Sequence, residues 1–443
     1  MRRSKILGLI IVSLIICIPF ITILYIVNDN NIYKNKSIVN SLSSVKGSFD
    51  NNYCGRWQEQ YTLLQREIDN SVNKKYLILD AWKNGWGDRL TQIISGFYVA
   101  LLSKRSFKII GIDLEEIFEK PNIDWSISKE ELEKLEAKNS VKKLYYTEFD
   151  KEQWNEGFLY TNFTSNYEDT EALIYRIQNG KLQRIFENVF HKQQLYEMGL
   201  RPDTAFGCAF EFLFKPKPEI INIVQDAYDD MKIKRSYYLG HKSQVLTEKN
   251  YLPNDDGLEP IRIGLQIRLG DNTFSDTGSF VCAENVLLFN QVKQFFDCAE
   301  SLEKEILEKP YEEYSNKISS INHKKKRDVY WLLLTDCKIL REKAKEKWPG
   351  KVITITDKSI NHIEKTNNKE ALGLAFAEHW LFGEMDYHII TKSSSYGRTA
   401  SLRRKIYHHI YDMAINSVRS SDDQCSLLNY NTFEETSKHW VEL

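Results

Sequence analysis

The sequence predicts an α/β protein of two doubly wound, Rossmann-like domains that face a cleft, preceded by a single N-terminal transmembrane helix. Three observations lead to this prediction. A basic cluster and a long uncharged stretch open the chain, short apolar runs then alternate with helical periodicity, and a polar segment at residues 236–259 interrupts that alternation. At 443 residues the chain is long enough for two hydrophobic cores of ordinary size.

The transmembrane helix is expected at residues 6–27, where 22 residues carry no charge. As a helix this stretch spans roughly 33 Å, enough to cross a bilayer core. No small-x-small cleavage site follows, which favours an uncleaved signal anchor over a cleaved secretory signal. Arg2, Arg3 and Lys5 precede the stretch, so the positive-inside rule predicts a cytoplasmic tail at 1–5 and a type II topology. The polar residues 28–52 are expected to form a stem.

The composition fits a globular body outside the cytoplasm. Besides Cys17 in the predicted anchor there are six cysteines, enough for up to three disulfides. Asn35 and Asn162 each begin an N-glycosylation sequon. The hydrophobic fraction of 42% indicates a folded protein, and the formal charge of -1 argues against a nucleic-acid binder.

The N-terminal domain is expected at residues 53–250. A helix from residue 56, a strand at 76–81, a glycine-containing loop and an amphipathic helix form its first unit. Such a unit leaves backbone N–H groups at a helix N-terminus, where anions bind, although Asp88 could simply cap that helix. The sequence further predicts a strand at 107–112, an irregular aromatic-rich region at 114–169, and helices at 170–194 and 219–234. Those aromatic side chains either line a sugar-acceptor cleft or form core.

The C-terminal domain, at residues 251–443, is organised around a buried strand at 261–267. Arg268 follows it directly, which places a permanent cation where open α/β sheets bind ligands, unless the side chain merely pairs with a surface carboxylate. If the sheet is parallel, Asp336 and residues 393–397 end neighbouring strands beside Arg268. Serine hydroxyls and helix amides at 393–397 suit a diphosphate. Further strands are expected at 328–334, 352–356 and 387–390, and helices at 285–309, 337–347 and 370–382.

Three segments resemble the GDP-fucose-dependent fucosyltransferases. The stretch GWGDRLTQIISGFYVALLSKRSFKI is similar to the G-x-G-[DN]-R-L segment that opens them. The stretch IGLQIRLGD resembles their arginine motif, H-x-R-x-G in α-1,2- and protein O-fucosyltransferases and Q-[IV]-R in plant xyloglucan fucosyltransferases. The stretch ALGLAFAEHWLFGEMDYHIITKSSSYGRTA is similar to a plant-family segment that ends in Ser-Thr-Phe-Gly. The segments cover under a quarter of the chain and occur in the family's order.

The resemblance implies a GT-B fold, GDP-fucose bound mainly by the C-terminal domain, and inverting transfer of fucose. Arg268 corresponds to the arginine that contacts the β-phosphate and stabilises the departing GDP. Gln266 stands where other branches have histidine, which favours the plant-like variant. The remaining donor-binding positions implied by the resemblance are Gly87, Arg89, Asp336, Glu378, Ser394, Ser395, Tyr396 and Gly397.

An inverting transfer also needs a group that takes the proton of the acceptor hydroxyl. Asp271 and Asp88 are candidates by their positions in loops. The chain has no D-x-D motif, so we expect neither a metal ion nor another cofactor. The function predicted is that of a Golgi fucosyltransferase of the α-1,2 type acting on a glycan. Two alternatives are a protein O-fucosyltransferase and a membrane-anchored sugar- or nucleotide-binding protein without transferase activity.

Overall fold

The computed structural model describes residues 54–81, 84–138, 140–146, 151–177, 180–233, 260–270, 287–308, 327–355, 369–392, 394–405, 409–415, 425–432 and 435–436. Residues 52–443 form one compact unit, separate from residues 1–51. The predicted tail, anchor and stem lie outside the described residues. Within the described ranges no helix is both long and apolar enough to cross a membrane.

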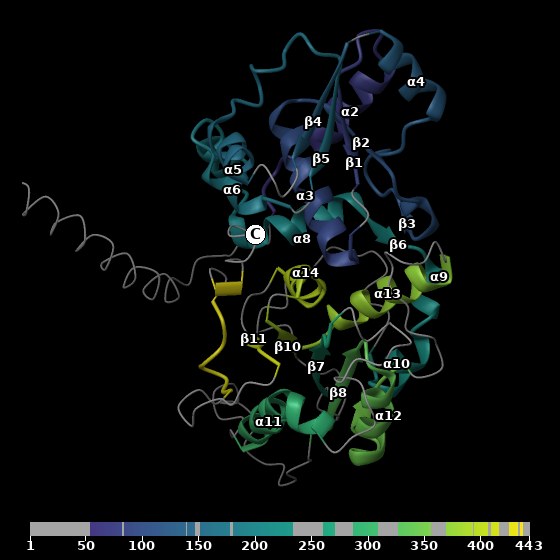
Figure 1. Ribbon diagram of the computed structural model, residues 1–443, viewed down its shortest axis with the longest axis vertical. Helices are drawn as coiled ribbons and strands as arrows, with labels where there is room; N and C mark the ends of the chain where they lie inside the picture. The colour runs from purple at the N-terminus through teal and green to yellow at the C-terminus, as the bar shows by residue number, and fades with distance from the viewer. Residues whose placement is uncertain are drawn as a thin grey trace, which may run out of the picture. The chain divides into compact units, whose positions relative to one another are not determined.

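The first sheet is parallel throughout and has the strand order β2-β1-β5-β4 (Figure 1). Its strands are β1 (Tyr76–Asp80), β2 (Ser106–Ile110), β4 (Val141–Tyr146) and β5 (Ala172–Ile177). Helices α2 (Gln58–Asn70) and α4 (Lys129–Ala137) pack on one face through Ile68 and Leu135. Helix α3 (Trp86–Leu102) packs on the other, so apolar side chains cover both faces.

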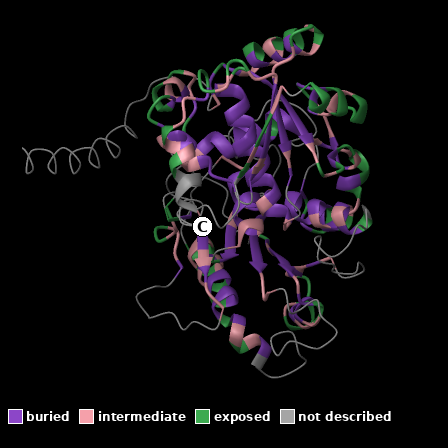
Figure 2. Cartoon of the chain, turned by 45° about the horizontal axis from the view of Figure 1, so that its top comes forward, coloured by how far each residue is buried: buried purple, intermediate pink, exposed green. Residues whose placement is uncertain are grey.

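The second sheet is also parallel, with the order β11-β10-β7-β8-β9. Strand β7 (Ile261–Ile267) lies at its centre with every residue buried, as expected for a strand covered on both faces. Around it are β8 (Val329–Thr335), β9 (Val352–Ile353), β10 (Tyr387–Thr391) and β11 (Ile410–Met413). Figure 2 shows most of the sheet strands as buried, whereas the edge strand β4 is intermediate to exposed.

Helices cover both faces of this second sheet. Helices α11 (Leu287–Glu308) and α12 (Lys338–Lys347) pack against the face to which Ile263 and Leu265 belong. Helices α13 (Lys369–Phe382) and α14 (Ser395–Leu402) join the larger core on the opposite face. The mixed α/β class with parallel sheets is therefore confirmed. The domain boundary predicted at residue 250 lies outside the described residues and stays a prediction.

Several expectations for the N-terminal half were wrong. Residues 170–194 hold strand β5 and the short helices α6 (Leu182–Glu187) and α7 (Lys192–Glu197) where one helix was expected. The region expected to be irregular contains α4, β4 and α5 (Lys151–Tyr160). Its buried aromatics, such as Phe118 and Trp125, are core rather than a sugar site. The remaining elements are η1 (Leu114–Glu116), β3 (Phe118–Glu119), α8 (Pro202–Leu213), β6 (Lys215–Pro216), α9 (Pro218–Asn222) and α10 (Gln225–Asp230).

Helix α3 also differs from its expected amphipathic character, because every one of its residues except Asp88 is buried. The first sheet covers one side, and α8 and α14 pack on others. Polar positions such as Gln92 and Ser95 gave the sequence its amphipathic pattern, yet both are fully buried. A helix surrounded on all sides cannot be recognised from the period of its polar residues alone.

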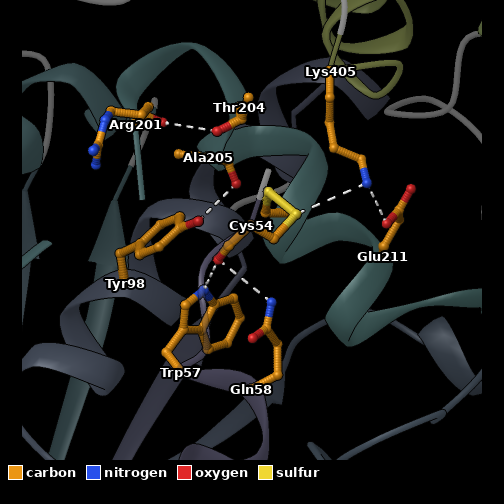
Figure 3. The surroundings of a disulfide bond; sticks show 10 residues. Cys54, Trp57, Gln58, Tyr98, Arg201, Thr204, Ala205, Glu211 and Lys405 are labelled. Atoms are coloured by element: carbon orange, nitrogen blue, oxygen red, sulfur yellow. Dashed lines mark hydrogen bonds and ion pairs between the residues drawn. A yellow bond between two sulfur atoms is a disulfide. The ribbon is translucent and has the colours of Figure 1, made fainter. Parts of the chain in front are cut away.

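Disulfides connect distant parts of the chain, as the even number of cysteines outside the predicted anchor allowed. Cys54 bonds to Cys208 in α8, and Cys298 bonds to Cys425; Cys337 is disulfide-bonded as well. Figure 3 shows the surroundings of the first bond, where Lys405 reaches across to Glu211, 2.5 Å from Nζ to Oε2. The segment before α2 is thereby fixed to α8, and a residue that follows α14 is fixed to the same helix.

Candidate functional site

The carboxyl ends of three neighbouring strands meet around Arg268, as the sequence predicted. Its backbone N–H donates to Oγ1 of Thr391, the last residue of β10, at 2.8 Å. Its guanidinium Nη1 donates to Oδ2 of Asp336, which directly follows β8, at 3.0 Å. Because the sheet is parallel, these three residues share one edge, the edge at which open α/β sheets bind ligands.

Asp336 shapes the turn that carries Arg268. Its side chain is only 4% exposed, and its oxygens also accept from the backbone N–H groups of Leu269 (2.9 Å) and Gly270 (3.1 Å). Burial raises the pKa of Asp336, and the charge of Arg268 opposes that shift. The carboxylate is directed into the protein, which favours a positioning role over the contact with ribose or guanine that the resemblance implied. The side chain of Arg268, by contrast, is 30% exposed.

Helix α14 begins at the same edge, three residues after β10 ends. Ser394 is its N-cap, and the hydroxyl oxygen accepts from the N–H of Gly397 at 3.5 Å. The first-turn amides of a helix carry partial positive charge and bind anions. Ser395 belongs to this first turn, whereas the hydroxyl of Tyr396 donates to the carbonyl of Ala375 in α13 at 2.6 Å. Burial raises the pKa of Tyr396, whose ring packs against the larger core.

Gln266 and Gly397 determine how closely α14 approaches β7. Oε1 of Gln266 accepts from the N–H of Thr391 at 3.2 Å, and a Cβ placed on Gly397 would lie 2.4 Å from the same Oε1. Gln266 is 4% exposed. Both residues therefore lie beneath the anion-binding edge and support it. Ser393, which was part of the predicted serine loop, lies outside the described residues.

The first sheet contributes the start of α3 to this site. A Cβ on Gly87 would lie 2.4 Å from the backbone carbon of Ser395 and 2.5 Å from the N of Tyr396. Only glycine permits two helix backbones to approach this closely. The N-termini of α3 and α14 therefore lie together, and the carboxyl edges of the two sheets meet at this contact.

The two residues that follow Gly87 have separate roles. The Nε of Arg89 donates to the carbonyl of Asn84 at 2.7 Å and closes the loop that leads into α3. Asp88 is not the helix cap, because that position belongs to Gly85. Burial lowers the pKa of Arg398 in α14, and the nearby charges of Asp412 and Asp88 oppose that shift. Asp88 thus lies near enough to Arg398 for the two charges to interact.

The side chain of Glu378 lies in the protein interior and not at the carboxyl edge of the sheet. Its carboxylate pairs with the guanidinium of Arg341, with Oε1 2.7 Å from Nη1, and the two side chains are 11% and 3% exposed. Arg341 also donates to the carbonyls of Thr335 (2.9 Å) and Ile355 (2.7 Å). This buried pair holds α12 and α13 against Thr335 at the end of β8, directly before Asp336. The implied contact of Glu378 with the nucleotide is not supported by this arrangement.

The remaining predicted positions are Asp271, Asn35 and Asn162. Asp271, a candidate base, and Asn35 lie outside the described residues. Asn162 is half-buried in a turn, where its Oδ1 accepts from the N–H of Thr164 at 3.1 Å. Within the ranges that the structure describes, no cluster of His, Cys, Asp or Glu is arranged to hold a metal ion.

Sequence reasoning missed three residues that build the site. Thr391 bonds the end of β10 to Arg268, Arg341 bonds α12 to the end of β8, and Arg398 is fully buried in α14. Thr391 was detectable, because it closes the strand directly before the serine run. Arg341 lies in a helix outside any motif, and Arg398 lies within the third resembling segment, but the burial of both side chains could only be seen in the folded chain.

Comparison with solved structures identifies the fold. FUT1 of Arabidopsis thaliana, solved as a mutant in complex with GDP, is 16% identical with a TM-score of 0.52, covering 83% of this chain and 77% of FUT1. The chain shares the fold of that fucosyltransferase. NodZ from Bradyrhizobium, also a fucosyltransferase, is 14% identical over 74% of this chain and 93% of NodZ, and its TM-score of 0.41 is too low to support an argument. No protein-family model and no curated protein matches the sequence.

The resemblance read from three short segments is therefore confirmed at the level of fold. The segments contribute α3, β7 with its arginine, and α13 to α14, which are the elements that meet at the site. The residues between these segments complete the two parallel sheets and their helices, although no motif was recognised in them.

Proposed function

We propose that this chain transfers fucose from GDP-fucose to a glycan acceptor, with inversion at the anomeric carbon and an α-1,2-type linkage. The observation that supports this most directly is the position of Arg268, held by Asp336 at the edge of the sheet beside the start of α14. A fixed guanidinium and a helix N-terminus are the groups that stabilise a diphosphate leaving group. The structural neighbour FUT1 was solved with GDP, which agrees with this assignment.

In the proposed reaction the acceptor hydroxyl oxygen attacks C1 of the β-linked fucose. The bond from C1 to the β-phosphate oxygen breaks, its electron pair stays on GDP, and an α-fucoside forms. Arg268 and the first-turn amides of α14 stabilise the charge that develops on the β-phosphate. The acceptor proton goes to a general base. Asp88, beside the start of α14, and Asp271 are the candidates.

The proposal assigns the donor to residues 251–443 and the acceptor to residues 53–250. It needs no metal ion, since Arg268 supplies the positive charge that a bound cation would otherwise provide. The uncharged stretch at 6–27, the sequons at Asn35 and Asn162 and the disulfides support a type II protein of the Golgi membrane.

The full-length protein in detergent tests the proposal. GDP release is measured from GDP-fucose, GDP-mannose and UDP-galactose, in EDTA, with and without pooled oligosaccharides. Release that is specific for GDP-fucose and stimulated by oligosaccharides is the expected result. Stimulation by a folded protein domain alone would favour the protein O-fucosyltransferase. Calorimetric binding of GDP without release from any donor would identify a binding protein.

A further inference from the structure

The carboxyl edge of the first sheet carries a group of three side chains that the site described above does not use. Asp80 is the last residue of β1, Arg176 is next to last in β5, and Tyr145 is next to last in β4. Tyr145 lies opposite Arg176 in the strand register, and Asp80 follows Leu79, which lies opposite Tyr175. The three side chains therefore form a row across neighbouring strands on one face of the sheet.

Contacts hold this row together. Nε of Arg176 donates to Oδ2 of Asp80 at 2.9 Å, and its guanidinium carbon lies 4.8 Å from the ring centroid of Tyr145. The arginine thus pairs with a carboxylate at one end and stacks on an aromatic ring at the other. Such an arrangement fixes the orientation of all three side chains before any ligand arrives.

The row is open to solvent. Tyr145 is 43% exposed, and the side chains of Arg176 and Asp80 are 37% and 17% exposed. Helix α4 covers the neighbouring part of this face, where Glu131 accepts from the hydroxyl of Tyr76 at 2.7 Å and Glu136 pairs with Lys143 of β4 at 2.6 Å. The rest of the face buries apolar residues such as Ile78 and Ile174. The exposed end of the face is therefore the carboxyl end, where open α/β sheets bind ligands.

The chemistry of the row matches a sugar. A carboxylate accepts from hydroxyls, a guanidinium donates to ring or hydroxyl oxygens, and an exposed tyrosine ring packs on the apolar face of a pyranose. The row also shares its edge with the start of α3, whose Gly87 contacts Ser395 at the edge of the second sheet. Exposed ion pairs contribute little to the free energy of folding. A pair formed for stability alone would therefore not need an exposed tyrosine ring packed against its arginine.

From this arrangement we infer that Asp80, Arg176 and Tyr145 bind the oligosaccharide acceptor, with Tyr145 as the stacking platform. That the bound oligosaccharide is the acceptor rests on the proposed function, whereas the binding of an oligosaccharide at this row is a separate physical claim. It names residues of the first sheet that no sequence motif indicated.

The experiment measures oligosaccharide binding directly. The full-length protein is screened for binding of galactose-, glucose- and N-acetylglucosamine-terminated oligosaccharides, and affinities are measured for the best binder. Tyr145→Ala is expected to weaken that affinity about tenfold, as for truncation of an aromatic anchor. Tyr145→Phe keeps the ring and is expected to retain the affinity. Asp80→Asn, which conserves shape, is expected to weaken binding as well.

Tyr160 provides the matched control, because it is a 61% exposed tyrosine elsewhere in the same half of the chain. Tyr160→Ala should leave oligosaccharide affinity unchanged, and GDP affinity should be equal in all variants. Unaltered affinity in both Tyr145→Ala and Asp80→Asn, or a wild-type protein that binds none of these oligosaccharides, would overturn the inference. Oligosaccharide binding lost in Tyr145→Ala, in a wild-type protein that never releases GDP from GDP-fucose, would instead support this site and reject the proposed function.

Discussion

The carboxyl edges of the two sheets are built differently. At the second sheet, Arg268 lies in a turn fixed by three hydrogen bonds to the buried carboxylate of Asp336. At the first sheet, Asp80, Arg176 and Tyr145 form a row whose side chains are partly exposed to solvent. An edge that stabilises a developing charge must be rigid before the reaction, because reorganisation would cost part of the stabilisation. An edge that selects a ligand by stacking can remain open, so the difference suits a donor side and an acceptor side.

The largest effect on stability is expected from breaking the buried ion pair between Arg341 and Glu378 near the carboxyl edge of the second sheet. Glu378→Ala leaves the guanidinium of Arg341 buried without its carboxylate, which should lower the free energy of unfolding by roughly 3–5 kcal/mol. Glu342→Ala, on the same helix as Arg341, removes an exposed pair with Lys338 and is the control, with an expected change below about 0.5 kcal/mol. Urea denaturation measures both. Equal, small losses would show that the second edge is not braced by this pair.

The next effect concerns the contact between the two edges. Gly87→Ala places a Cβ within 2.4 Å of the backbone of Ser395 and should destabilise the fold by about 1–3 kcal/mol. Gly373→Ala adds its Cβ to a helix where the nearest side-chain atoms lie 3.4 Å away, so it should be neutral or stabilising. Thermal melts that show the same sign for both variants would contradict the close approach of α3 and α14.

A smaller effect is expected from Asp336→Asn, which keeps the shape of the side chain but removes the charge that holds Arg268. Turnover should fall about tenfold. Asp386→Asn is the control, since Asp386 accepts from the N–H of Arg262 at the opposite end of β7 and should leave turnover unchanged. A turnover equal to that of the wild type in Asp336→Asn would contradict the positioning role.

The acidic limb of the pH profile gives a second test of Asp336. Burial raises its pKa, so the carboxyl takes up a proton at a higher pH than an ordinary aspartate. In the range between its unfolded and folded pKa values, protonation favours the folded state, while turnover depends on the ionised form. Turnover is therefore expected to fall with decreasing pH before stability does. A pH–rate profile whose acidic limb is the same in Asp336→Asn would exclude Asp336 as its origin.

The smallest effect on stability is expected at the open edge. Tyr145→Ala should change the free energy of unfolding by less than about 0.5 kcal/mol, because the ring is 43% exposed. The same substitution is expected to weaken oligosaccharide binding. A large loss of stability in urea would show that the row serves the fold and would remove the contrast between the two edges.

The same contrast explains how much could be predicted from the sequence. Strand β7 and the convergence at Arg268 were predictable, because Ile261, Ile263, Leu265 and Ile267 alternate as in a strand and the carboxyl ends of parallel strands share an edge. The row at the first edge was not, since β4 and β5 lie in stretches interpreted as irregular and helical. Polar residues such as Lys142 and Lys143 interrupt the apolar pattern of β4. Its pairing with β5 comes from the tertiary fold rather than from local sequence.

The roles of individual site residues were predicted less well than their positions. Gln266, Asp336 and Glu378 all lie close to the predicted site, yet each is largely buried and bonded to protein. A motif places a residue near a ligand, but the direction of its side chain depends on neighbours such as Thr391 and Arg341. Gly87 and Gly397 were predicted as donor-binding positions; in the structure Gly87 allows α3 to approach α14, and Gly397 allows α14 to approach Gln266 of β7 and Ile390 of β10.

The central claim is that Arg268 stabilises the departing diphosphate, and the most direct test is the rate of GDP release from GDP-fucose by Arg268→Ala and by the wild type. We predict a decrease of at least ~10²-fold with an unchanged melting temperature, since the side chain is 30% exposed and leaves the fold intact. A folded Arg268→Ala protein that releases GDP as fast as the wild type would contradict the claim.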